Sequence, residues 1–167
     1  MKRLLIAVSA AALFTSLSVS AAAAQNRTVI SQFGRDNGAA ASQQGVRNDV
    51  RIEQRGRAHY SRAVQNGRDN FLRMNQGGTR NQAVTEQYGA NNLAVTGQEG
   101  RRLDAAIYQS GNGNISGIAQ IGNGSIATTD QAGRNNTTGV IQVGANQDAS
   151  VVQRGANNIT VVIQGGP

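Results

Sequence analysis

Polar and apolar positions repeat along this chain with a period of eleven residues. In the last copy, which runs from Gln153 to Gln164, the residues Asn158, Thr160 and Val162 stand at every second position before the closing glutamine. Side chains of equal parity on a β-strand point to one face, so these residues share one face and the intervening aliphatic residues share the other. Each copy therefore predicts one strand of about seven residues and one turn.

The closing glutamine recurs in thirteen copies, and in most of them asparagine stands six residues before it. We expect both amides to face inward and to form ladders along an axis, because buried amides need partners and stacked layers supply them. The glutamines are Gln32, Gln43, Gln54, Gln65, Gln76, Gln87, Gln98, Gln109, Gln120, Gln131, Gln142, Gln153 and Gln164. The asparagines are Asn26, Asn37, Asn48, Asn70, Asn81, Asn92, Asn114, Asn136 and Asn158. His59, Leu103, Ser125 and Gln147 replace asparagine in the other copies and predict weak rungs.

A glycine two residues after each glutamine predicts the turn. Glycine, and the Asn, Asp or Gly residues that follow it closely, tolerate the positive φ values of tight reversals. The turn glycines are Gly34, Gly45, Gly56, Gly67, Gly78, Gly89, Gly100, Gly111, Gly122, Gly133, Gly144 and Gly155, and Gly113 and Gly124 strengthen the same interpretation.

A helical coiled coil is the main alternative, because eleven residues are also the repeat of a right-handed supercoil. Against it, a glycine in every copy would cost roughly 1 kcal/mol each inside a helix. The apolar positions also lie two residues apart rather than three or four. The pattern therefore favours strands.

We predict an all-β solenoid of thirteen strand-turn units, because a strand with this inward face must be covered by another strand. If successive strands alternate between two sheets, two units make one coil of 22 residues, and equivalent side chains stack at about 4.8 Å. The expected core between the sheets combines small and aliphatic residues: Ala39, Ala83, Ala105, Ala127, Ala149, Ile52, Ile107, Ile118, Val140, Val151 and Val162.

Residues 1–24 differ from the rest of the chain and are typical of a secretory signal peptide. Lys2 and Arg3 precede an apolar run, and Ala22 to Ala24 forms an A-x-A cleavage site. The repeat solenoid then occupies residues 25–167, which hold no second apolar stretch long enough to span a membrane. We expect a secreted protein whose stability comes without disulfides, since the chain has no cysteine.

Charge is uneven along the repeats. Residues 25–102 hold twelve arginines and six acids, whereas the later residues hold two arginines and three acids. Arg51, Arg62 and Arg73 fall at outward positions, and stacked like charges disfavour pairing, so these arginines are candidate gatekeepers against premature aggregation. A solvated face is the simpler interpretation. Extracellular DNA or anionic polysaccharide is a possible partner of the basic half.

The two ends of the predicted solenoid carry no recognisable cap, so further copies of the chain can add to the stack. The last strand is apolar on both faces. Val161, Val162 and Ile163 therefore form a candidate assembly end, and self-polymerisation is the expected behaviour.

Other chemistry finds little support in the sequence. His59 is the single histidine and cysteine is missing, which argues against a transition-metal site. Nucleotide-binding loops, nucleophile motifs and paired acids are also lacking, so we expect neither an enzyme nor a bound cofactor. A monomeric ice-binding solenoid would need a regular outward array of threonine, and outward threonine is irregular here.

The spacing Q-x-G-x-x-N-x-A-x-x-x-Q resembles the curlin repeat. It is formed by Gln32, Gly34, Asn37, Ala39 and Gln43, again by Gln76, Gly78, Asn81, Ala83 and Gln87, and once more from Gln87 to Gln98. The resemblance implies a β-solenoid subunit of curli, the functional amyloid fimbriae of bacterial biofilms and cell adhesion. It also implies an extracellular cell-surface location, with other curlin-like subunits and an outer-membrane export channel as partners.

Two departures bear on the role within that family. Major curlin subunits carry a Gly-rich leader before the repeats, and no such leader is visible in this sequence. Their half-repeats also tend to alternate in spacing, which is not the case here. The uniform step of eleven and the basic charge look more like the minor, nucleating subunit. Fibre-building subunit and nucleator therefore remain alternatives, together with a monomeric solenoid that binds polyanions or ice.

Overall fold

A computed structural model describes residues 25–166, so the predicted signal peptide at residues 1–24 lies outside the described part. The described residues form thirteen β-strands, all joined by short bends. The strands are β1 (Arg27–Arg35), β2 (Gly38–Val46), β3 (Asp49–Arg57), β4 (Tyr60–Arg68), β5 (Phe71–Thr79), β6 (Gln82–Ala90), β7 (Leu93–Arg101), β8 (Asp104–Asn112), β9 (Ile115–Asn123), β10 (Ile126–Arg134), β11 (Thr137–Ala145), β12 (Asp148–Ala156) and β13 (Ile159–Gly165).

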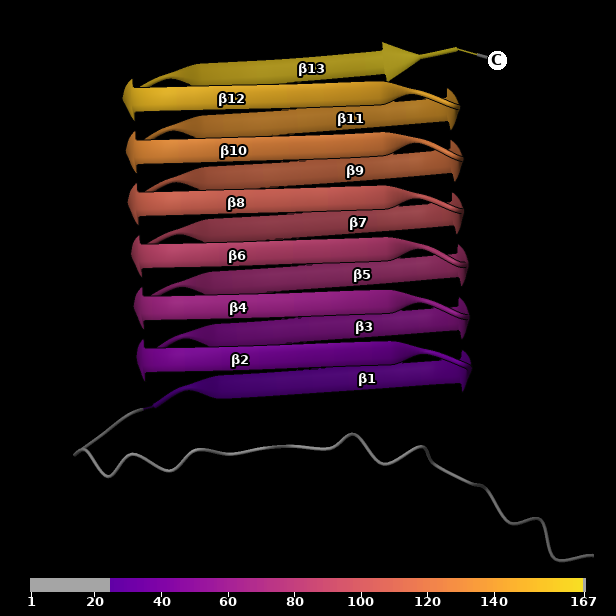
Figure 1. Ribbon diagram of the computed structural model, residues 1–167, viewed down its shortest axis with the longest axis horizontal. Helices are drawn as coiled ribbons and strands as arrows, with labels where there is room; N and C mark the ends of the chain where they lie inside the picture. Colours follow the sequence, from indigo (N-terminus) through magenta and orange to yellow (C-terminus); the bar gives the residue numbers. More distant parts are fainter. Residues whose placement is uncertain (1–24, 167) are drawn as a thin grey trace, which may run out of the picture.

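The strands alternate between two parallel sheets. The odd-strand sheet has the order β1-β3-β5-β7-β9-β11-β13 and the even-strand sheet the order β2-β4-β6-β8-β10-β12. Every strand pairs with the strand 22 residues away, so that Gln76, for example, lies beside Gln54 and Gln98. Figure 1 shows odd and even strands running in opposite directions, with β1 and β13 at opposite ends of the stack. The predicted solenoid with two strands per 22-residue coil is confirmed.

The strands are longer than the sequence pattern predicts, because they continue past the glycine. Twelve strands have nine residues rather than about seven, and Gly34 is the eighth residue of β1. The reversal follows at Asp36 and Asn37 instead. Asp36 has a φ of 60°, and the equivalent residue of every later bend also has positive φ. The glycine is therefore the end of a strand, and the bend residue proper stands two positions later.

The core lies between the two sheets and is formed by one parity of every strand. All residues of the expected core contribute, with Ala39 and Val162 in the end coils only partly buried. Val50, Leu72, Met74, Ala63 and Ala94 also belong to it. These five obey the same parity, so the alternation of the strand carries them inward together with the predicted set.

Candidate functional site: the amide ladders and the open ends

The inward glutamines form two continuous hydrogen-bonded columns, one along each sheet. In the odd-strand sheet, Nε2 of each glutamine donates to Oε1 of the glutamine 22 residues later, from Gln32 to Gln164, at 2.7–2.9 Å. The even-strand sheet repeats this arrangement from Gln43 to Gln153 at 2.8–2.9 Å. All thirteen glutamines take part, and each donation points towards the C-terminal coil.

The second N–H of the glutamine amide ties one sheet to the other. Gln98 Nε2 donates to the backbone oxygen of Gln82 at 2.8 Å as well as to Gln120, and Gln54 makes the equivalent bond to Gly38. Both hydrogens of an amide are used in this way at buried positions. A buried amide without partners would cost about 1–3 kcal/mol, so the ladder turns a polar core position into a stable one.

The inward asparagines act differently, because they brace the bends through the backbone. Asn92 Oδ1 accepts from the backbone N–H of Asn114 at 3.1 Å. Its Nδ2 donates to Tyr88 O within the same bend and to Gly111 O of the next coil. Direct bonds between asparagine side chains occur only in some steps, such as Asn70 to Asn48. The asparagine column is therefore a set of bend braces that connect neighbouring coils.

The four replacements in the asparagine column show how the brace weakens. His59 imitates asparagine, since Nδ1 accepts from Asn81 N–H at 3.3 Å and Nε2 lies 3.1 Å from Arg55 O. Ser125 Oγ accepts from the backbone of Gln147. Gln147 donates to Val143 O, but its Oε1 is buried without a partner. Leu103 has no polar group and replaces the brace by apolar burial.

The glycine column sets how closely coils approach each other. A Cβ on Gly89, which has a φ of 112°, would overlap the carbonyl oxygen of Gly111 in the next coil. The same overlap occurs at the other column glycines up to Gly144, which lies beneath Gly166. Gly155 belongs to the last coil and would meet only Asn158 Nδ2 at 3.7 Å. The column is therefore required for coil stacking and ends where the stack ends.

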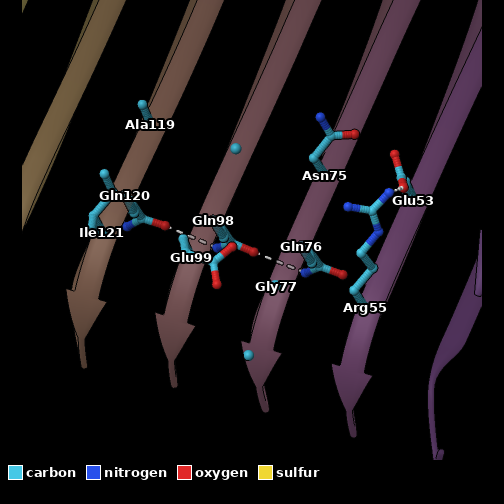
Figure 2. Close-up of a pocket in the computed structure, with 12 residues that line it drawn as sticks. Glu53, Arg55, Asn75, Gln76, Gly77, Gln98, Glu99, Ala119, Gln120 and Ile121 are labelled. Carbon is cyan, nitrogen blue, oxygen red and sulfur yellow. Dashed lines mark hydrogen bonds and ion pairs between the residues drawn. The ribbon is translucent and has the colours of Figure 1, made fainter. Parts of the chain in front are cut away.

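A hollow of about 610 Å³ lies on the outer face of the odd-strand sheet, over Gly77 and Gly97 (Figure 2). The side chain of Glu99 occupies the space that a Cβ on Gly77 would need. Arg55 forms an ion pair with Glu53 at the rim. Residues 25–166 contain no group of three metal-ligating side chains, and the hollow is open to solvent. The hollow exists because Gly77 and Gly97 carry no side chains on this surface of the sheet.

Four of the twelve arginines in the basic half form ion pairs with acids. Arg47 pairs with Asp69 at 2.6 Å, and this hydrogen bond raises the pKa of Arg47 and lowers the pKa of Asp69. Arg51 pairs with Asp49 at 2.8 Å and lies 5.3 Å from the ring centroid of Phe71. These pairs are exposed and contribute little stability each.

The three candidate gatekeepers lie on outward faces in different settings. Arg62 on β4 pairs with Glu86 on β6 at 2.5 Å. Arg51 and Arg73 are direct neighbours in the register of β3 and β5. Two like charges are therefore adjacent on the odd-strand sheet, and only one of them lies beside a carboxylate.

The candidate assembly end is the last strand. Val161 and Ile163 point outward with 61% and 72% of their surface exposed, and Val162 packs partly against the core. At most bends, the backbone N–H of the first residue of a strand donates to a backbone oxygen of the next coil. The last bond of this series joins Thr137 N to Asn158 O. In the described part of the chain, the strand starts at Asp148 and Ile159 have no corresponding bond. Within residues 25–166, no helix is long and apolar enough to cross a membrane.

This geometry defines a parallel β-solenoid of eleven-residue units whose coils are joined by amide columns. The family profile of the curlin associated repeat matches residues 46–78 and 67–100. Residues 46–100 therefore contain curlin associated repeats, and these repeats suggest a curli-related structural protein. A comparison with curated proteins found no match.

Proposed function

We propose that this chain is a structural subunit of extracellular, curli-like functional amyloid fibres that serve the biofilm matrix and cell adhesion. The observation that carries the proposal is that, within residues 25–166, the glutamine columns are directional and their end rungs have a glutamine partner on one side each. Gln153 and Gln164 close the C-terminal ends of the two columns, and Gln32 and Gln43 begin them. One end can donate where the other end can accept.

A second copy continues both sheets without any change in geometry. Its β1 extends the even-strand sheet beside β12, and its β2 extends the odd-strand sheet beside β13. Gln153 then donates to Gln32 of the second copy and Gln164 to its Gln43, as in every internal step. Parallel pairing with stacked identical amides is the arrangement of cross-β fibres. The curlin repeats support the same conclusion and a structural, non-enzymatic role outside the cell.

Within this function, β13 recruits the next molecule. Its exposed Val161 and Ile163 stand beside unpaired strand edges, so apolar contact and backbone pairing add at one place. A chain that ends at Asn157 is expected to polymerise more slowly. The other candidate role is to nucleate fibres of a second curlin-like subunit, and the uniform step of eleven favours it. If a substoichiometric amount of this chain speeds the polymerisation of that subunit, the chain is a nucleator.

The purified chain from residue 25 tests the proposal directly. We expect fibres that bind amyloid dyes and diffract at about 4.8 Å. A chain that stays monomeric at high concentration contradicts the proposal.

Two adjacent glycines provide a matched test of end-to-end stacking. Gly166 lies in the glycine column and Gly165 in an outward position, and an added Cβ meets nothing within 4 Å at either place in the single molecule. Gly166→Ala should leave the soluble chain folded but slow fibre growth, because the next coil would approach it as Gly111 approaches Gly89. Gly165→Ala should grow normally. Equal growth of both variants argues against this stacking.

A further inference from the structure

The outer faces of the two sheets differ in chemistry. On the odd-strand sheet, the outward residues of β9, β11 and β13 are uncharged and mostly aliphatic or small: Ile115, Gly117, Ala119, Ile121, Asn123, Thr137, Gly139, Ile141, Val143, Ala145, Ile159, Val161, Ile163 and Gly165. We call this surface the apolar face. Ile159, at 77%, is the most exposed of its aliphatic side chains.

The other outer surfaces of the solenoid are charged. On the even-strand sheet, Glu86, Asp104, Asp130 and Asp148 place an outward acid on each strand from β6 to β12. On the odd-strand sheet itself, the outward positions of β1, β3, β5 and β7 hold seven arginines against three acids. One sheet is therefore basic in its first half and apolar in its second.

We propose that the apolar face binds the apolar face of a second copy of this chain, with the two solenoid axes antiparallel. The contact is lateral, so it goes beyond the end-to-end stacking proposed above and does not require it. The two copies are related by a two-fold axis that runs along β11 between the two faces.

Side-chain sizes on this face fit that arrangement. The two-fold axis places β9 of one copy against β13 of the other at equal positions along the strand. Val161 then meets Gly117, Ile163 meets Ala119, and Gly165 meets Ile121. Large residues lie against small ones in these three pairs, whereas Ile159 meets Ile115, and Ile141 and Val143 meet their own copies across the axis. The three pairs of unequal size allow the two flat sheets to interlock as in a dry steric zipper. Gly117 leaves open space, since an added Cβ there would meet nothing within 4 Å.

Charge selects the antiparallel orientation. If the two solenoids were parallel, the basic halves would lie face to face and repel each other. In the antiparallel arrangement each basic half extends beyond the end of its partner, so the interface contains no charged side chain. A second copy therefore matches this surface in both shape and charge.

A lipid surface fits less well. Membrane-surface helices place aromatic side chains such as Trp and Phe, together with Leu, on the face that enters the lipid. The outward positions of β9, β11 and β13 contain neither aromatic nor basic residues. The flat aliphatic pattern favours a protein sheet as the occupant.

The size of the interface predicts a weak pair. Three strands at about 4.8 Å, each about 23–30 Å long, cover roughly 400 Å² of sheet per copy. Stable interfaces bury about 800 Å² per partner. A single pair is therefore transient, whereas chains held in fibres would associate through many such contacts at once.

Cysteine cross-linking with a short bifunctional reagent detects a transient pair, and the chain has no native cysteine to interfere. Gly139 lies next to the proposed two-fold axis, and a Cβ there meets only Val161 at an ordinary 3.9 Å. We expect Gly139→Cys to form a covalent dimer when the freshly purified soluble chain is treated with a short bis-maleimide, because facing sheets lie about 10 Å apart, too far for a direct disulfide. Asn75→Cys on the basic half should not, because β5 extends beyond the partner. Equal cross-linking of both variants would overturn the antiparallel arrangement.

A matched pair of arginine substitutions identifies the surface. Ile141 on β11 and Ile126 on β10 are exposed to similar extents, 42% and 47%, but lie on different sheets. Added to Gly139→Cys, Ile141→Arg should reduce the cross-linking rate at least about tenfold, because two arginines would face each other on the axis. Ile126→Arg should leave the rate unchanged. Equal rates in the two double variants would overturn the proposal.

The lipid occupant is tested with the same protein. Flotation of the wild-type chain with phosphatidylcholine vesicles, together with no cross-linking of Gly139→Cys, would overturn the proposal. Failure to float supports it when cross-linking occurs. Because these assays use the soluble chain, they are independent of dye binding. A chain that cross-links but never forms fibres would refute the proposed function alone.

Discussion

Thr129 on β10 and Ser116 on β9 share a hydrogen bond of 2.7 Å between their hydroxyl groups inside the core. Thr85 and Thr96 occupy the position of Thr129 in other coils, but their Oγ1 atoms are buried without a partner. The same inward threonine is therefore satisfied in one coil and unsatisfied in two others.

We predict that Thr85→Val stabilises the protein and that Thr129→Val destabilises it. Valine keeps the shape and removes an unpaired hydroxyl at Thr85, which should raise the free energy of unfolding by about 1 kcal/mol. At Thr129 it should lower this free energy by about 1–2 kcal/mol, because Ser116 loses its partner. Denaturant unfolding of the soluble chain measures both. Equal effects of the two substitutions would contradict the assigned hydrogen bonds.

We predict that an interior rung of the glutamine column matters more than an end rung. Gln98→Met keeps the volume but leaves Gln76 Nε2 without its acceptor and Gln120 Oε1 without its donor. The expected loss is about 2–4 kcal/mol of unfolding free energy. Gln164→Met removes the bond from Gln142 and an exposed bond to the backbone oxygen of Asp148, and because solvent can replace both it should cost less than about 1 kcal/mol. The prediction is wrong if both variants unfold at the same denaturant concentration.

We predict that relief of backbone strain at Ala58 stabilises the chain. Ala58 holds a φ of 58° in its bend, where most other coils place Asn, Asp or Gly. The left-handed conformation costs roughly 1–2 kcal/mol for an L-residue, so Ala58→Gly should raise stability by about 1 kcal/mol. Ala106→Gly, inside β8, is the control and should lower stability by roughly 0.5–1 kcal/mol. Thermal unfolding midpoints that move in the same direction would refute this account.

We predict opposite pH effects at two aspartates. Burial raises the pKa of Asp104 above its unfolded value, so ionisation of this carboxyl weakens the folded state as pH rises through its folded pKa. Asp104→Asn should therefore stabilise the protein at pH 7. This gain should disappear below the unfolded pKa of about 3.9.

Asp69 provides the matched control, because the hydrogen bond from Arg47 lowers its pKa. Its stabilisation is present above the unfolded pKa and is lost as pH falls through the lower folded pKa. Asp69→Asn should therefore destabilise the protein at pH 7 and have no such effect in strong acid. Stability measured from pH 3 to pH 8 should show the two variants diverging in opposite directions.

We predict that Arg51 and Arg73 together delay fibre formation. They are adjacent in register on β3 and β5, so their mutual repulsion opposes pairing of these strands. Replacing both by threonine should shorten the lag of dye binding. An unchanged lag would show that the two arginines only solvate the face.

The architecture was predictable from the sequence because period and parity carry it. A step of eleven with alternating side chains specifies strand, turn and inward face at once, and the structure has thirteen strands in two parallel sheets. The extra strand length was not predictable in this way. The conformational freedom of glycine predicts a turn at Gly34, but Gly34 lies in β1. Glycine is needed there because a Cβ would overlap the backbone of the next coil.

Contacts between neighbouring coils were harder to predict than the architecture. Asn92 braces a bend through backbone groups of two coils, which the spacing of asparagines does not reveal. Arg47 and Arg80 adopt positive φ at bends where their residue type argues against it, because both flanking strands impose the conformation. The apolar face can be recognised in the sequence only if every second unit is compared, because alternate units lie on the same sheet. Ile141 and Ile163 indicate only the C-terminal end of this face.

The odd number of strands has a consequence for any end-to-end assembly. After β13 the next strand falls on the even-strand sheet, so β1 of each added molecule begins on the side opposite to that of its predecessor. Successive molecules are therefore turned by half a revolution, and two molecules make one full repeat of about 62 Å. Each side of such a filament shows the basic and aliphatic halves of one molecule and then the even-strand sheet of the next, whose outward charges balance. A polymer built from a one-sided subunit thus becomes two-sided and can adhere to neighbours on both flanks.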